Sequence, residues 1–251
     1  SIPGIKLATI SAGLKDKNRK DLMLIVLDDG SLVSGTFTQN KFCAAPVIVS
    51  KNHLKITGNT KALLVNTGSA NAGNGAKGID DAETTCKFLA LELNVDPNKV
   101  LPFSTGVIMS PLPVDKIKKS IPNLIKDLKD NNWLDASEAI MTTDTIPKAV
   151  SKAVLIEGQQ VNITGMSKGA GMIHPNMATM LAFIGTDANI SLDMLQKINK
   201  EIVNLTFNCI SVDGDSSTND SFMLISSNQA KHSQIVQVDN NYKILKAAIF
   251  D

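Results

Sequence analysis

Short apolar segments typical of β-strands are mixed irregularly with amphipathic helical segments along this chain, and this mixture most constrains its fold. The strand-like segments are rich in apolar and β-branched residues, and several end at turn residues such as Gly30 and Gly158. We expect strands at residues 22–27, 46–49, 62–65 and 154–156.

The helical segments are marked by apolar residues that recur every three or four positions. Residues 81–93 show this spacing at Ala82, Cys86 and Leu89, and Ser191 is a suitable N-cap for a later helix. The stripe of that later helix consists of Leu195, Ile198, Ile202 and Leu205.

Two prolines indicate further helix starts, because proline is well tolerated in the first turn of a helix. We expect one helix to begin after Pro113, a second to begin at Pro122, and another to cover residues 133–141. Strands and helices follow no regular βαβ alternation, so the order favours an α+β sandwich over a doubly wound sheet.

Charge and hydropathy exclude several classes of partner. The 251 residues are 43% hydrophobic and carry a formal net charge of +1, which gives no basic excess for nucleic acid or for a membrane surface. Small molecules or other protein chains are the expected partners. No apolar run approaches the roughly 20 residues that span a bilayer, and residues 1–4 do not resemble a signal peptide, so a cytoplasmic location is expected.

The cysteines do not predict a metal or redox site. Cys43, Cys86 and Cys209 are far apart, without a Cys-x-x-Cys pair or a histidine at ligand spacing. Each lies among apolar or small residues, so we expect reduced thiols buried in the core and no bound metal.

Several loops are richer in Gly, Ser, Thr and Asn than a simple connection requires. They cover residues 66–73, 104–107, 141–145, 168–172 and 213–220. Such groups hold polar substrates or a developing oxyanion, although the same residues also dominate ordinary turns. None of these loops has the glycine spacing of a phosphate-binding loop or the complete ligand pattern of a calcium loop.

One junction places a hydroxyl where a glycine-rich loop enters an apolar segment, at Ala178-Thr179. Thr179 there could attack the carbonyl of Ala178, and hydrolysis of the resulting ester would release the Thr179 amine. That amine could act as general base for its own hydroxyl, so no histidine is needed, although His174 lies nearby in sequence. From the residues alone, the simpler interpretation that Thr179 caps a helix is preferred.

The segment around this junction closely resembles the self-cleavage segment of the ornithine acetyltransferase family, also called glutamate N-acetyltransferases, of arginine biosynthesis. The resemblance extends over essentially the whole chain, through residues 21–25, 35–40, 66–72, 104–108, 139–145, 168–183 and 213–220. It implies a layered α/β/β/α sandwich of the kind found in self-processing acetyltransferases and aminopeptidases. It also implies an α-chain portion, residues 1–178, and the start of a β-chain portion, residues 179–251, without the family's C-terminal remainder.

The resemblance further implies an activity and its site residues. Thr179 would take the acetyl group from N-acetylornithine and pass it to glutamate, after cleavage between Ala178 and Thr179. Thr105 and Gly106 match the family's oxyanion hole. Lys168 matches a substrate-binding lysine, and one of Thr142 and Thr143 matches a substrate-binding threonine.

The resemblance implies no cofactor, although acetyl-CoA could serve as the acetyl donor if the enzyme is bifunctional. The α and β pieces of one precursor would remain together, and an oligomer is expected. Met109 departs from the pattern, because the family often has glycine there. Two alternatives remain open, a self-processing aminopeptidase or amidase that passes the acyl group to water, and a truncated homologue without catalysis.

Overall fold

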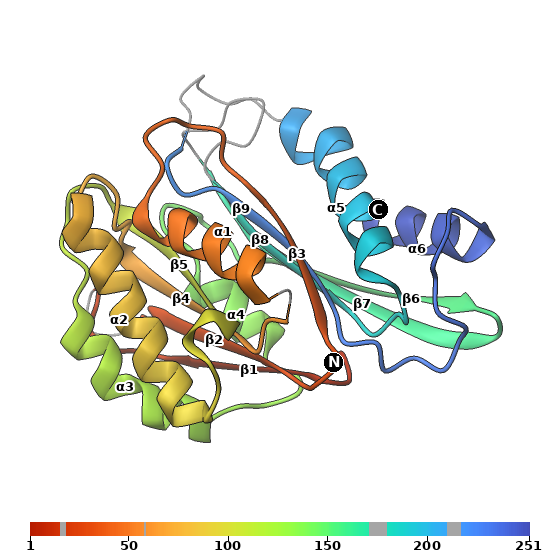
Figure 1. Ribbon diagram of the computed structural model, residues 1–251, viewed down its shortest axis with the longest axis horizontal. Coiled ribbons are helices and arrows are strands. Elements are labelled where there is room, and N and C mark those ends of the chain that lie inside the picture. The colour runs from red at the N-terminus through yellow and green to blue at the C-terminus, as the bar shows by residue number, and fades with distance from the viewer. Residues whose placement is uncertain (16–18, 58, 171–179, 210–216) are drawn as a thin grey trace.

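The computed structural model describes residues 1–15, 19–57, 59–170, 180–209 and 217–251. These residues form two stacked sheets with helices on both outer sides (Figure 1). The first sheet contains β1 (Ile5–Ile10), β2 (Leu22–Leu27), β4 (Ala62–Ser69) and β5 (Val100–Val107), in the order β1-β2-β4-β5. Its pairs are antiparallel except for β4 and β5, which run parallel.

The second sheet contains β3 (Leu32–Phe37), β6 (Lys148–Ile156), β7 (Gln159–Lys168), β8 (Leu181–Thr186) and β9 (Ser221–Ser226). Its order is β3-β9-β8-β7-β6, and β8 and β9 are its parallel pair. Strands β8 and β9 lie after residue 179, whereas β7 and β3 lie before it. The two portions of the chain on either side of the junction therefore share one sheet.

The helices are α1 (Ala45–Thr57), α2 (Gly75–Leu93), α3 (Val114–Lys126), α4 (Trp133–Ala139), α5 (Leu192–Leu205) and α6 (Asn240–Phe250), with 3-10 turns η1 (Pro97–Lys99) and η2 (Phe207–Cys209). Figure 1 shows α2 and α3 beside the first sheet and α5 and α6 beside the second. No helix in the described part of the chain is long and apolar enough to cross a membrane.

Three apolar clusters hold these layers together. The central cluster lies between the sheets, where Phe103 of β5 meets Phe183 of β8 edge to face, with ring centroids 5.2 Å apart. A second cluster joins the outer face of the first sheet to α2 and α3, and a third joins the second sheet to α5 and α6. This arrangement confirms the α+β class and the α/β/β/α layering.

The expected strand at residues 46–49 is wrong, because this segment lies in helix α1. Val47, Val49 and Ser50 are buried along the helix, and Pro46 is tolerated because it lies in the first turn. A short apolar run does not by itself distinguish a strand from a buried helix.

Pro122 does not begin a second helix, since α3 continues through it. Ile117, Ile121 and Leu124 form a buried stripe across the proline, and their burial offsets the roughly 3 kcal/mol that an interior proline costs. Helix α5 begins after Ser191 as expected, and the Ser191 hydroxyl accepts from the N–H of Met194. Leu205, at the end of its stripe, is 57% exposed rather than buried.

The prediction of three buried thiols holds for Cys86 alone. Cys86 is completely buried on the inner side of α2, whereas Cys43 is half-buried and Cys209 is exposed. Cys209 lies in η2, after the end of α5 and beyond the last buried residues of that helix. All three are free cysteines.

Candidate active site

A cavity of about 1180 Å³ lies where strand ends of the two sheets meet. Of the residues expected at the site, Thr105, Gly106, Thr142, Thr143 and Lys168 all line it. Ala178, Thr179 and His174 lie outside the described residues. The other lining residues are Leu14, Lys15, Arg19, Gly68, Ala70, Val107, Ile108, Met180, Leu181, Ser217, Thr218, Asn219 and Asp220.

The sheet registers explain why these distant residues meet. In the first sheet, parallel β4 and β5 place Thr67 opposite Thr105 and Gly68 opposite Gly106 at their carboxyl ends. In the second sheet, Lys168 at the end of β7 pairs with Leu181, the first residue of β8. Met180 directly precedes that strand and is itself part of the cavity wall.

Gly106 occupies a position that only glycine fits without strain. Its φ is +136°, and a Cβ added there would lie 2.3 Å from the backbone carbon of Gly68. This close approach keeps the Gly106 backbone in the cavity wall, next to the buried Thr105. A backbone N–H and a hydroxyl in adjacent residues are suitable donors to an oxyanion.

A hydrogen-bond network, which the sequence alone did not indicate, joins the loop at residues 217–220 to these strand ends. The Asn219 side-chain amide donates to the carbonyls of Ala70, at 2.7 Å, and Ser104, at 2.9 Å. The Ser104 hydroxyl donates to the Asn66 side chain at 2.5 Å. These contacts connect the two sheets at the edge of the cavity. In the sequence, only the polar composition of the loops could have suggested them.

Lys168 is a cation enclosed by protein, with 5% of its surface exposed. Burial lowers the pKa of its ammonium group to about 8, and the negative charges of Asp220 and Asp144 limit that decrease. A lysine in such a place can bind an anionic substrate group with little competition from water.

Asp220, across β8 from Lys168, is a buried carboxyl with 1% of its surface exposed. Burial raises its pKa to about 6. One carboxyl oxygen, Oδ1, accepts from the N–H of Met180 at 2.7 Å.

Asp144 links two of the expected substrate-binding segments. Its carboxylate accepts from the N–H of Gly169 at 2.9 Å, from the N–H of Thr142 at 3.4 Å, and from Lys148. Burial alone would raise the pKa of Asp144, but Lys148 and these N–H groups outweigh it, so the pKa is lowered. Thr142 and Thr143 both line the cavity, so the choice between them stays open.

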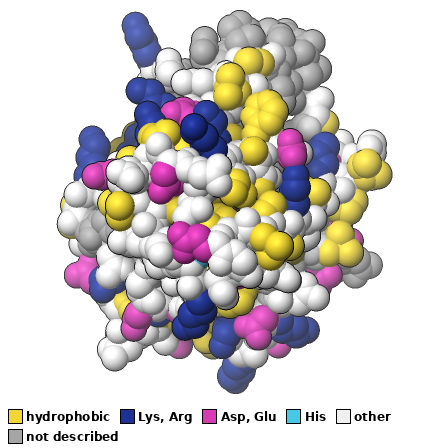
Figure 2. All heavy atoms as spheres, turned by 90° about the vertical axis from the view of Figure 1, so that its right-hand side faces the viewer, with side chains coloured by type: hydrophobic (Ala, Val, Ile, Leu, Met, Phe, Trp, Pro, Cys, Tyr) yellow, Lys and Arg dark blue, Asp and Glu magenta, His cyan; other side chains and the backbone are white. Residues whose placement is uncertain are grey.

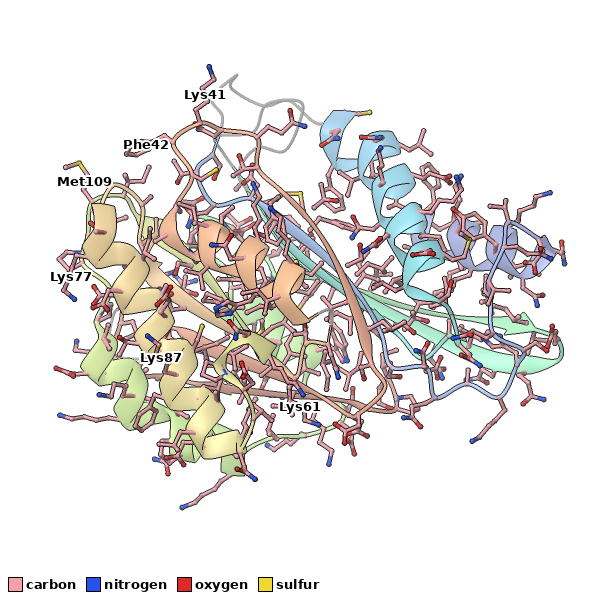
Figure 3. All side chains as sticks on the ribbon, in the orientation of Figure 1. Lys41, Phe42, Lys61, Lys77, Lys87 and Met109 are labelled. Atoms are coloured by element: carbon pink, nitrogen blue, oxygen red, sulfur yellow. The ribbon has the colours of Figure 1, made fainter. Side chains whose placement is uncertain are left out.

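Met109 has a left-handed backbone, with φ of +62°, which explains why glycine would suit this position. Its side chain is 74% exposed and projects from the end of the molecule near Phe42 (Figure 3). A Cβ added to Gly73 would meet the side chains of Met109, at 3.0 Å, and Phe42, at 3.5 Å, and Met109 is not among the residues that line the cavity. Met109 therefore lies on the outer side of the loop after β5 rather than on its cavity side.

The two described histidines are engaged elsewhere. His53 Nδ1 lies 2.7 Å from the carbonyl of Val100, and His232 Nε2 accepts from the N–H of Asn189 at 3.0 Å. Neither lines the cavity. Within the described ranges, no three His, Cys, Asp or Glu side chains are grouped closely enough to hold a metal ion.

A second apolar cavity, of about 560 Å³, lies between the second sheet and the ends of α5 and α6. Figure 2 views the end of the molecule that carries this region and shows hydrophobic side chains gathered near its centre. Val150 of β6 and Phe250 of α6, which line this cavity, are both exposed apolar residues. This cavity contains none of the expected site residues.

Comparison with known sequences gives one consistent result. The model of the ArgJ family matches residues 6–251. The arginine biosynthesis bifunctional protein ArgJ of Colwellia psychrerythraea is 52% identical over 239 residues, which is 91% of this chain and 56% of that protein. This chain therefore spans little more than half the length of that relative.

Solved structures give the same result. ArgJ of Bacillus halodurans is 37% identical, with a TM-score of 0.61 over 70% of this chain and 92% of that one. Ornithine acetyltransferase of Mycobacterium tuberculosis, solved with ornithine, is 29% identical, with a TM-score of 0.62 over 72% of this chain and 94% of that one. An aminopeptidase of Ochrobactrum anthropi shares the fold alone, at 8% identity and a TM-score of 0.57 over 99% and 82%.

Proposed function

This chain belongs to the ArgJ family, and from that membership we propose that it carries the acyl-transfer site of a glutamate N-acetyltransferase, or ornithine acetyltransferase. The observation that supports this most strongly is the cavity itself. Five expected residues from separate parts of the sequence line this one cavity. Met180, which follows the proposed nucleophile Thr179 in the sequence, lines it as well.

In the first proposed step, the chain cleaves itself. The Thr179 hydroxyl attacks the carbonyl carbon of Ala178, the C–N bond breaks, and the acyl group moves to oxygen as the new amine takes up a proton. Water then hydrolyses this ester, which leaves a carboxylate on Ala178 and restores the Thr179 hydroxyl. The strand pairs β7–β8 and β3–β9 cross the junction, so they would keep the α and β pieces associated after cleavage.

In the second step, the Thr179 hydroxyl attacks the acetyl carbonyl of N-acetylornithine, with its own amine as general base. Ornithine leaves with the proton, and the acetyl group stays on Thr179 until the amine of glutamate attacks it. The Thr105 hydroxyl and the Gly106 N–H would stabilise the tetrahedral oxyanion in both half-reactions. Loss of one such donor typically costs about 2.7–4 kcal/mol of barrier.

Both substrates carry an α-carboxylate, and Lys168 is the proposed partner for it. Its position in the cavity wall and its burial support this role, because a buried ammonium without a bound anion is costly. Thr142 or Thr143 would add a hydroxyl contact. The proposal requires no cofactor, leaves acetyl-CoA as an alternative donor, and includes a cytoplasmic oligomer.

Intact mass spectrometry of the complete gene product tests this function. We expect a species that begins at Thr179, and one added acetyl group on it after incubation with N-acetylornithine. Thr179→Ala should abolish both results, whereas Thr145→Ala, an exposed threonine outside the cavity lining, should change neither.

The acceptor separates the alternatives. Glutamate-dependent consumption of N-acetylornithine would support the transferase, and release of acetate without glutamate would instead indicate a hydrolase. A single uncleaved chain that never gains an acetyl group would indicate a homologue without catalysis.

A further inference from the structure

The carboxyl of Asp220 is built into the cavity wall, yet the proposed reaction assigns it no role. Its Oδ1 accepts from the N–H of Met180, and a hydrogen bond with the Ser217 side chain further limits the rise of its pKa. A carboxyl buried to this degree is costly for the fold unless its charge and hydrogen bonds are satisfied. Such a group is therefore a candidate for a functional role.

Asp220 is held rigidly at the edge of the second sheet. Its carbonyl accepts from the N–H of Thr38 at 2.9 Å, and the next residue, Ser221, donates its N–H to the carbonyl of Met180 at 3.1 Å. Both backbone groups of Met180 are thus tied to residues 220 and 221.

The same carboxyl acts on Lys168 through charge. Lys168 pairs with Leu181, and Leu181 pairs with Ser221, the residue after Asp220, so Lys168 and Asp220 lie close together across β8 and both line the cavity. Four charged groups act on the ammonium: Asp220 and Asp144 raise its pKa, and Lys15 and Lys148 lower it. Asp220 is the larger of the two favourable influences.

We propose that Asp220 is a positioning residue for this site, which holds the N–H of Met180 at the start of β8 and keeps Lys168 in its carboxylate-binding, charged form. This inference rests on the proposed function. Its two parts are separable, because asparagine retains a side-chain acceptor for the N–H but removes the charge, whereas alanine removes both.

The matched control is Asp187, at the other end of β8. It is also buried, and its carboxylate accepts from the backbone N–H and the side-chain amide of Asn162, both at 2.7 Å. It does not line the cavity. Asp187→Asn therefore changes a buried carboxylate beside β8 without altering the proposed site.

The complete gene product is assayed for the rate at which the species beginning at Thr179 appears, and for kcat and kcat/KM against pH. We expect Asp220→Ala to lower kcat and the cleavage rate by about 100-fold, the effect of a displacement of roughly 1 Å in a reacting group. We expect Asp220→Asn to retain most of kcat but to move the alkaline limb of kcat/KM to lower pH by about one unit. Asp187→Asn should leave kcat, cleavage and the alkaline limb as in the wild type.

Thermal melts of the variants separate activity from folding. If Asp220→Asn melts like Asp187→Asn and also retains the wild-type alkaline limb, the charge role is overturned. If Asp220→Ala cleaves and turns over at the wild-type rate, the positioning role is overturned. If the wild type itself never transfers acetyl groups, the proposed function fails, which is a different outcome from an active wild type with unaffected variants.

Discussion

Replacement of Gly106 by alanine would test the close approach of β4 and β5 on which the proposed oxyanion hole depends. The new Cβ would lie 2.3 Å from the Gly68 backbone carbon, whereas ordinary contacts begin at 3.4 Å, so the strands must separate by about 1.1 Å. The obstacle is backbone rather than a flexible side chain, so local rotation cannot relieve it. The φ of +136° adds strain of about 1–3 kcal/mol for a residue with a Cβ.

Gly30→Ala separates these two contributions. Gly30 also has a positive φ, of +85°, but a Cβ there meets nothing within 4 Å. We expect Gly30→Ala to lower the free energy of unfolding by about 1–2 kcal/mol. Gly106→Ala should cost about 2 kcal/mol more, because the separation of the strands weakens the last ladder hydrogen bonds, worth roughly 1 kcal/mol each.

Urea unfolding of both variants measures this difference through the midpoints, provided that the slopes agree. In the complete enzyme, Gly106→Ala should also lower kcat by about 10²–10³-fold, as expected for the loss of one oxyanion donor. Equal destabilisation by the two substitutions would refute the close approach. A stable Gly106→Ala enzyme with normal kcat would refute its role in catalysis.

Further predictions concern Lys168, Asp144 and the cysteines. The pKa of Lys168 is about 8, below 10.5 in an unfolded chain, so between these pH values the unfolded state binds more protons and stability rises with pH. Lys168→Met should lack this rise of about 3 kcal/mol, and parallel pH profiles of the urea midpoints would contradict the assignment. Asp144→Asn should lower the free energy of unfolding at pH 7 by about 1–3 kcal/mol and raise the KM for N-acetylornithine. Because the pKa of Asp144 is lowered, the stability difference should shrink as pH falls below 3.8, and a constant difference would argue against its ion pair. A maleimide should label exposed Cys209 in the folded protein but reach Cys86 only after denaturation, since burial raises the pKa of that thiol; equal labelling rates by mass spectrometry would disprove this.

Local features of the fold were predictable where a few neighbouring residues decide the outcome. The cap at Ser191 and the stripe of Leu195, Ile198 and Ile202 predicted the start and the buried side of α5 correctly. The same reasoning failed for residues 46–49, because the burial of α1 beside β5 decides between strand and helix there. At Pro122, buried neighbours likewise outweigh the local preference of proline.

The candidate site was partly predictable for a different reason. The resemblance to a known family, carried by motifs separated along the chain, indicated Thr105, Gly106 and Lys168, and the structure brings them to one cavity. The proposed roles of these residues, and of Thr179, remain predictions. Asn219 and Asp220 lie in a polar loop that the sequence singled out, but their individual contacts could not be assigned in advance, because composition does not show which atoms a loop residue meets.

By itself, the sequence determined the α+β class, the capped helix α5 and the set of polar motifs, because periodicity and capping act over a few adjacent residues. Only the tertiary structure decided that Lys168 and Asp220 are buried charges and that Gly106 is pressed against Gly68. These properties arise between segments far apart in the chain, such as Ser104 and Asn219, which are 115 residues apart yet hydrogen-bonded. Burial and electrostatic environment depend on which segments the fold brings together, and no local pattern contains that information.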